Sequence, residues 1–148
     1  MTQDELKERF KIFSIRVIRM VDSMPSTISG RAIAAQVVRS GTSPAANYRA
    51  ACLAKSERDF INKLKNVEEE LDETRHWLEI ITEAELLPAK RLEPLQSECE
   101  ELLKIIVKSI VSTKNISHQT SDIFTTYNLL LHPETSAELS NCKLSNCK

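Results

Sequence analysis

The sequence predicts an all-α protein, an antiparallel up-down four-helix bundle. The chain of 148 residues contains only two glycines, whereas an all-β sandwich or barrel needs many tight turns. Apolar residues instead recur at alternating spacings of three and four along several segments, as they do on one face of an α-helix. The short connections between these segments favour antiparallel neighbours.

The first predicted helix begins after Thr2, which forms a capping-box pattern with Glu5. One apolar stripe then follows a single face of the helix until Pro25 ends it. The stripe consists of Leu6, Phe10, Phe13, Val17, Met20 and Met24.

The second predicted helix begins near Ser29 or Gly30 and carries Gly41 and Pro44 in its interior. Glycine weakens a helix, and proline lacks the amide hydrogen and disfavours helical geometry at the residue before it. We therefore expect a kink or a short break, after which the helix resumes through Cys52. Small residues around this kink should let a neighbouring helix approach closely; they are Ser40, Gly41, Thr42, Ser43, Ala45 and Ala46.

Polar residues near this kink have a structural interpretation. Asn47 is placed to hydrogen-bond the backbone that Pro44 frees, and Gln36 and Arg39 are placed to do the same across helices. No nucleophile in this stretch has a base beside it in the sequence. We therefore expect a structural role here rather than a catalytic one.

The third predicted helix has the clearest pattern. Ser56 is its N-cap, with Asp59 three residues later, and it extends to about Glu85. A connection of two to four residues follows. The apolar stripe consists of Phe60, Leu64, Val67, Leu71, Thr74, Leu78 and Ile81.

The fourth predicted helix begins around Pro88, because proline is tolerated in a first turn, and Pro94 should bend it or delay its regular start. The pattern stops after Lys114. We expect residues 1–114 to form the bundle and residues 115–148, rich in Ser, Thr and Asn, to form a largely irregular, flexible or loosely docked tail. The inward face consists of Leu95, Cys99, Leu102, Leu103, Ile106, Ile110 and Thr113.

Polar residues at fixed spacings carry a resemblance to a known family. A Gln-x-x-Arg-Ser run is followed by Ser, by Ala-Asn and by Ser-x-x-Asp-Phe; a Glu-x-x-x-x-Trp-Leu-Glu pattern matches residues 72–79 with Asp in first place. The matching residues of the first part are Gln36, Arg39, Ser40, Ser43, Ala46, Asn47, Ser56, Asp59 and Phe60. Over about residues 6–114 the chain resembles the four-helix-bundle family named for proteins encoded in 23S ribosomal RNA intervening sequences.

This resemblance implies a bundle that assembles as a homo-oligomeric ring, a pentamer, and that has no enzymatic activity. It also implies similarity to accessory proteins of diversity-generating retroelements, which bind nucleic acid. The retroelement-type relatives are strongly basic, whereas this chain has a net charge of −1. Any attraction to nucleic acid must therefore come from local clustering of charge.

Charge is segregated along the chain. Residues 31–65 hold seven basic and two acidic residues, whereas residues 66–101 hold twelve acidic and three basic residues. A phosphate backbone requires cations along a solvent face, so the candidate nucleic-acid-binding residues are Arg39, Arg49, Lys55, Arg58 and Lys65. The alternative is that these are ordinary solvated charges, partly paired with the acidic half. Tyr48 is the only nearby aromatic residue besides the core-facing Phe60, which gives little support for base stacking.

The second half of the third helix has apolar residues away from its core stripe. Trp77, Ile80 and Ala84 are candidate residues of an oligomer interface, because Trp77 and Ile80 would be exposed on a monomer and tryptophan is a favoured interface anchor. The alternative is that the tail, at residues 127–131, folds over this patch.

The sequence gives little evidence for a metal site, a cofactor or a membrane-spanning segment. Glu73 and His76 form one Glu-x-x-His unit, but a di-iron bundle needs a second copy on another helix. Cys142 and Cys147 lie in the polar tail, where we expect free thiols rather than a metal site or a disulfide. We expect no metal, no cofactor and no small-molecule substrate. No apolar run approaches the roughly 20 residues of a membrane span, and no apolar signal region begins the chain, so we expect a cytoplasmic protein.

The sequence thus predicts a non-catalytic homo-oligomeric scaffold that binds RNA or a nucleoprotein partner through its basic segment. The alternative function is a protein–protein interaction module that does not bind nucleic acid.

Overall fold

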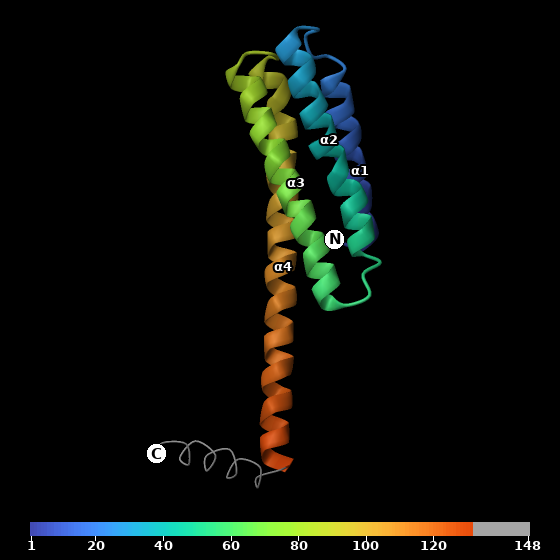
Figure 1. The fold of residues 1–148 in the computed structure, drawn as a ribbon, viewed down its shortest axis with the longest axis vertical. Coiled ribbons are helices and arrows are strands. Elements are labelled where there is room, and N and C mark those ends of the chain that lie inside the picture. Colours follow the sequence, from blue (N-terminus) through green and yellow to red (C-terminus); the bar gives the residue numbers. More distant parts are fainter. Residues whose placement is uncertain (132–148) are drawn as a thin grey trace, which may run out of the picture. The chain divides into compact units, whose positions relative to one another are not determined.

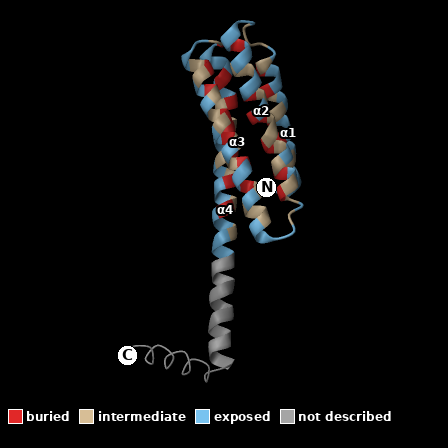
Figure 2. Ribbon diagram, in the orientation of Figure 1, coloured by how far each residue is buried: buried red, intermediate tan, exposed pale blue. Residues whose placement is uncertain are grey.

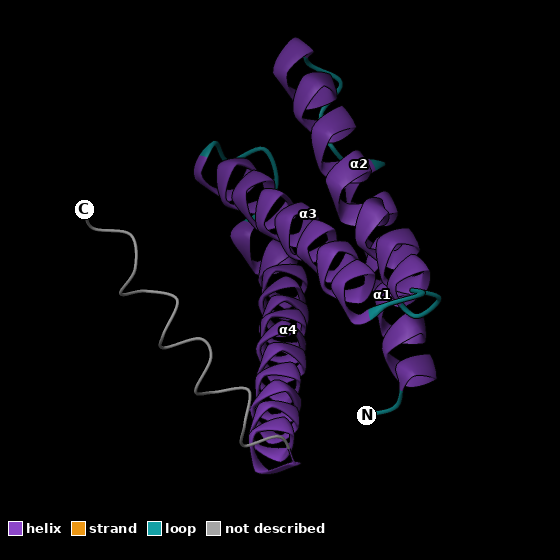
Figure 3. Cartoon of the chain, turned by 60° about the horizontal axis from the view of Figure 1, so that its bottom comes forward, coloured by secondary structure: helices purple, strands orange, loops and turns teal. Residues whose placement is uncertain are grey.

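The computed structural model describes the backbone of residues 1–131 and the side chains of residues 1–116, and every regular element in that part is an α-helix (Figures 1 and 3). The helices are α1 (Gln3–Val21), α2 (Ile28–Ala51), α3 (Glu57–Glu83) and α4 (Ala89–Leu131). Residues 1–111 form one compact unit, and α4 continues past it into a second. In the first unit the helices run alternately up and down as a bundle, which confirms the predicted fold class.

The capping box predicted for α1 is present. The Glu5 amide donates to Thr2 Oγ1 at 3.2 Å, and the Thr2 amide donates to Glu5 Oε2 at 2.6 Å. The helix ends at Val21, before Pro25. Its predicted stripe lies in the core, except that Met24 is only half-buried.

The sequence predicts a kink or a short break in α2, and no break occurs. The helix begins after the N-cap Thr27, slightly earlier than predicted, and continues without interruption past Pro44. The fixed φ of proline is compatible with a helix, and buried residues on both sides of Pro44, including Val37 and Tyr48, hold the segment against its neighbours. A bend at Pro44 stays a prediction.

Among the small residues of α2, Gly41 acts as the sequence predicts. Helix α2 packs against both α1 and α3. Gly41 lies directly against Val17, since a Cβ added at Gly41 would lie 2.7 Å from Val17 Cγ1 and 2.9 Å from Val17 Cγ2. The absence of a side chain at this position therefore sets the α1–α2 distance.

Helix α3 has the predicted N-cap, because Ser56 Oγ accepts from the Asp59 amide at 3.1 Å. Its stripe is buried from Leu64 to Ile81, and Phe60 is half-buried. The connection to α4 comprises residues 84–88, slightly longer than predicted. Glu85 adopts a left-handed backbone conformation there, with φ 52°, as is common just after the end of a helix.

Helix α4 differs from its prediction at its C-terminal end. It begins at Ala89, as predicted near Pro88, and includes Pro94, so Pro94 does not delay its start and a bend there stays a prediction. It also continues to Leu131, past the predicted end at Lys114, so residues 115–131 are helical rather than irregular. No glycine or proline interrupts the chain between Pro94 and Pro133, which explains how a helix persists where the apolar stripe ends. The predicted irregular structure of residues 132–148 lies outside the described residues.

The core lies between the inward faces of the four helices, as the buried positions in Figure 2 show. Phe10 and Phe13 of α1 and Leu71 and Leu78 of α3 are among its largest fully buried side chains. Among the described residues, no helix combines the length and the apolar character that crossing a membrane requires.

Candidate nucleic-acid interface

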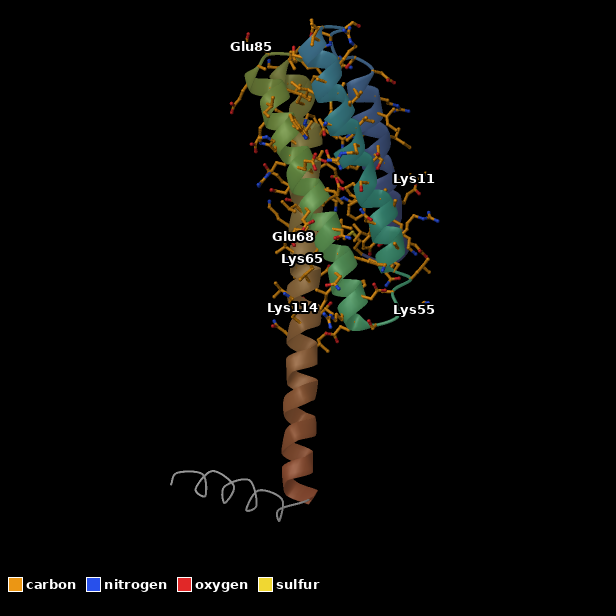
Figure 4. All side chains as sticks on the ribbon, viewed as in Figure 1. Lys11, Lys55, Lys65, Glu68, Glu85 and Lys114 are labelled. Atoms are coloured by element: carbon orange, nitrogen blue, oxygen red, sulfur yellow. The ribbon has the colours of Figure 1, made fainter. Side chains whose placement is uncertain are left out.

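Three of the five predicted cations lie at the end of the bundle that carries the α2–α3 connection. Arg49 is in the last turn of α2, Lys55 is in the connection, and Arg58 is in the first turn of α3. All three are exposed, and none forms an ion pair within the described part of the chain. Figure 4 shows Lys55 at this end, with Glu85 at the opposite end. These three cations are therefore available to an external anion.

Asp59, in the first turn of α3, is already paired with a lysine. The Lys55 amide donates to Asp59 Oδ2 at 3.3 Å, and the Lys63 ammonium lies 2.5 Å from Asp59 Oδ1. The hydrogen bond from Lys63 is the main reason that the pKa of Asp59 lies below its ordinary value. Asp59 is thus matched by Lys63, whereas Glu57 in the same turn forms no ion pair within the described part of the chain.

Lys7 of α1 also lies near this end, a position that sequence reasoning did not identify. The hydrogen bond to Asp4, at 2.9 Å, is the main cause of the raised pKa of Lys7, and the neighbouring charge of Arg49 opposes that rise. No sequence signal links Lys7 to Arg49, because the two residues meet only when α1 packs beside α2.

The structure does not place Lys65 and Arg39 with the other three. Lys65 forms an ion pair with Glu68 at 2.6 Å (Figure 4), and it lines a groove of about 350 Å³ between α3 and α4. The groove is also lined by Glu68, Glu69, Asp72, Leu103 and Val107. Its acidic rim disfavours a polyanion.

Arg39 of α2 reaches across to α3. Its guanidinium forms ion pairs with Glu70, at 3.2 Å, and with Glu73. The hydrogen bond from Arg39 is the largest cause of the lowered pKa of Glu73. The prediction that Arg39 bonds backbone across helices is therefore wrong, since it bonds carboxylates instead, and this pairing makes it a weaker candidate for binding nucleic acid.

Two other polar predictions for α2 are corrected. Asn47 Nδ2 donates to Ser43 Oγ at 2.9 Å rather than to backbone near Pro44. Gln36 is exposed, and it forms no hydrogen bond to another helix within the described residues. The buried polar link between α2 and α3 is made instead by Ser40 and Thr74.

Aromatic side chains contribute little to this surface. Tyr48 is buried, and its ring centroid lies 5.1 Å from that of Phe10. Burial is the main reason that the pKa of Tyr48 rises to about 12. Phe60 is half-buried and lines a hollow of about 300 Å³ together with Lys55. This end therefore presents charged side chains and few exposed aromatic faces.

The predicted oligomer residues are less exposed than expected on an isolated chain. Trp77 is half-buried against the core, and its Nε1 donates to Glu73 Oε1 at 3.2 Å. Ile80 is also half-buried, whereas Ala84, the C-cap of α3, is exposed. The predicted cover by residues 127–131 lies outside the described side chains.

Sequence reasoning missed an exposed apolar face on α1. Ile12, Ile15 and Ile18 are 49%, 38% and 43% exposed, which places all three on the side of α1 away from the core. Their spacing of three was the available signal, but the stronger core stripe of the same helix obscured it.

No metal centre can be assembled from the described residues. Among them, no three His, Cys, Asp or Glu side chains lie close enough together to hold a metal ion. Glu73 of the Glu-x-x-His unit is bonded to Arg39 and Trp77. Cys99 is buried, and burial raises the pKa of its thiol to about 12. Cys142 and Cys147 lie outside the described residues.

A family model and a solved structure both match this chain. The family model described as 23S rRNA-intervening sequence protein matches residues 5–108. The chain is 30% identical to a solved structure from Bacteroides thetaiotaomicron, described as a protein of unknown function from the S23 ribosomal protein family, with a TM-score of 0.69. That match covers 74% of this chain and 98% of the other. No curated protein matches the chain.

Proposed function

The chain belongs to the 23S rRNA-intervening sequence protein family, and on that premise we propose that it is a non-catalytic, homo-oligomeric scaffold that binds RNA or an RNA-containing nucleoprotein. The contact surface is the end of the bundle that carries Arg49, Lys55 and Arg58. The single observation that carries this proposal is that these three exposed cations have no ion-pair partner in the described part of the chain.

The free cations match what a phosphate backbone needs. Affinity for nucleic acid comes largely from the release of counterions when lysine and arginine neutralise phosphates. A cation already paired with a carboxylate gains less, because the new contact must replace an existing one. Lys65 and Arg39 are paired in this way, so we assign them a minor contribution to RNA affinity.

The test is binding of a fluorescently labelled single-stranded RNA at low salt. The variant Arg49→Gln/Lys55→Gln/Arg58→Gln should bind at least tenfold more weakly than the wild type. The control variant Lys11→Gln/Arg75→Gln/Lys104→Gln removes the same charge from cations that are paired with neighbouring carboxylates, and it should bind almost as well as the wild type. Equal weakening in both variants would show that only net charge matters and would overturn the proposal.

The proposed assembly is a ring of identical chains, a pentamer as the family resemblance implies. Two apolar surfaces support self-association: the outward isoleucines of α1, and the half-buried Trp77 and Ile80 of α3. Light scattering measures the mass directly. Trp77 is the only tryptophan in the chain, so a change in its emission on dilution would report dissociation at α3. A monomeric mass at all concentrations would rule out the ring.

A second candidate function has its own observation. The groove lined by Leu103 and Val107, with Glu68, Glu69 and Asp72 at its rim, combines apolar and acidic character. A basic amphipathic segment of a protein partner would fit that chemistry. Pull-down after nuclease treatment separates the two functions, because a protein partner held by this groove would be retained and one bridged by RNA would be lost.

A further inference from the structure

We propose that Arg16, Arg19 and Arg91 form a binding site for a phosphate group, at the end of the bundle opposite the proposed RNA surface. These side chains, with Met20 and Leu95, line a hollow of about 190 Å³ between α1 and α4. The C-terminal end of α1 and the first turn of α4 both lie at this end (Figure 1).

The register of the two helices shows that this arrangement is unusual. Seven residues before Arg16 on α1, Arg9 forms a bidentate ion pair with Glu98 of α4. Arg9 Nε lies 2.6 Å from Glu98 Oε1, and Arg9 Nη2 lies 3.0 Å from Glu98 Oε2. Arg16 follows Arg9 by seven residues and Arg91 precedes Glu98 by seven, so each lies about two turns further along the same antiparallel contact. Where the first pair is Arg–Glu, the second is Arg–Arg.

Within the described part of the chain, Arg16, Arg19 and Arg91 form no ion pair. The nearest acids along the chain are Asp22, the C-cap of α1, and Glu93 of α4, and neither pairs with any of the three. Like charges facing one another across a groove are destabilising unless an anion lies between them.

The position of Arg91 strengthens the inference. It lies in the first turn of α4, which contains no acidic residue. The N-terminus of a helix favours negative charge, because its first amide groups are unpaired and the helix dipole is positive there. A cation at this place opposes the dipole, and a bound anion removes the conflict.

The hollow suits a small tetrahedral oxyanion. Its volume is about 190 Å³. It is below the range of about 300–1,000 Å³ that is typical of pockets for larger organic ligands. Met20 and Leu95, both 5% exposed, form an apolar floor, so the polar contacts come from the guanidinium groups, whose planar forks match phosphate oxygens. The shared chemistry is a phosphate group, either free or in an RNA backbone, and the experiment separates these two sources.

The experiment measures thermal unfolding of the full chain in sodium phosphate and in sodium chloride at matched ionic strength. Phosphate at high concentration also stabilises proteins generally, so the titration stays at about 10 mM or below. We expect phosphate to raise the Tm of the wild type by about 3 °C or more in a saturable way. The variant Arg16→Gln/Arg91→Gln should lose this rise. The variant Arg58→Gln, which removes an unpaired arginine elsewhere, should keep it.

A charge-reversal variant distinguishes loss of the phosphate site from loss of folding. Arg91→Glu places a carboxylate opposite Arg16, as Glu98 lies opposite Arg9, so its Tm in chloride should equal or exceed that of the wild type. Its response to phosphate should be absent. An equal wild-type Tm in both salts, or an undiminished phosphate response in Arg16→Gln/Arg91→Gln, would overturn the proposal.

RNA binding identifies the source of the phosphate. If Arg16→Gln/Arg91→Gln also weakens binding of labelled RNA, the ligand is a backbone phosphodiester; if RNA binding is unchanged while the phosphate response is lost, the ligand is a free phosphate. Both results support the site. The variant Arg49→Gln/Lys55→Gln/Arg58→Gln should keep the full phosphate response, so failure of the proposed RNA surface and failure of this site give different results.

Discussion

The hydroxyl oxygens of Thr74 on α3 and Ser40 on α2 lie 3.1 Å apart, within hydrogen-bonding distance, and neither side chain is exposed to solvent. The Thr74 hydroxyl donates its one proton to the Glu70 carbonyl oxygen at 2.7 Å, so its oxygen accepts from Ser40. Among residues 1–116, Ser40 and Thr74 are the two buried polar side chains. They fix the register of the two helices that lead into the proposed RNA surface.

Substitution of Thr74 tests this link. Thr74→Val keeps the shape but leaves the Ser40 hydroxyl without its partner, so the free energy of unfolding should fall by about 1–3 kcal/mol. Ser40→Ala should cost less, because Thr74 keeps the Glu70 carbonyl. Denaturant unfolding of both single variants and the double variant gives the coupling energy. Strict additivity would show that the two hydroxyls do not support each other.

Gly41→Ala tests the close contact between α1 and α2. Alanine favours a helix over glycine by about 1 kcal/mol, but its Cβ would meet the buried, rotationally stiff Val17. Overpacking costs about 1–3 kcal/mol, and we expect a net loss of stability. In a Val17→Ala background the same substitution should become neutral or stabilising, as measured by denaturant unfolding. A loss of equal size in both backgrounds would contradict the contact.

Cysteine reactivity tests the burial of the core. Cys99 is buried, its Sγ lies 3.4 Å from the Leu71 carbonyl oxygen, and its thiol has a pKa of about 12. Cys52 is half-buried. In a Cys142→Ser/Cys147→Ser variant at neutral pH, a thiol reagent should modify Cys52 at least tenfold faster than Cys99, and both should react rapidly in denaturant. Equal rates in the folded protein would mean that the core is open at Cys99.

The Arg39–Glu73 pair gives an acid-dependent contribution to stability. Arg39 holds the pKa of Glu73 below its ordinary value of 4.5. The contribution is therefore complete above the unfolded-state pKa and is lost as the pH falls through the lower, folded-state pKa. Arg39→Gln should lower Tm at neutral pH and narrow the Tm difference between neutral pH and about pH 3. Arg58→Gln, which removes an arginine that has no carboxylate partner among residues 1–116, should leave that difference unchanged.

Local patterns predicted much of the fold. The stripes of α1 and α3 and the caps at Thr2 and Ser56 follow from short-range rules, and the structure confirms them. The continuity of α2 past Pro44 did not follow, because packing against two neighbours outweighs the local cost of a proline. The extent of α4 did not follow either, since the prediction relied on an apolar stripe and a helix can outlast its stripe.

The candidate site was only partly predictable. The sequence shows which residues are cations, but their partners depend on contacts between distant segments. Arg39 meets Glu70 and Glu73 only when α2 packs on α3. Arg16 meets Arg91 only across the α1–α4 groove. Sequence reasoning therefore located the basic segment but could not separate its paired cations from its unpaired ones.

The salt dependence of RNA binding tests the central claim most directly, namely that three unpaired cations at one end of the bundle contact phosphates. For single-stranded RNA each contact contributes a slope of about 0.7 to the fall of log affinity with log salt concentration. The slope of Arg49→Gln/Lys55→Gln/Arg58→Gln should therefore be shallower than that of the wild type by about 2. The same slope in both proteins would contradict the account.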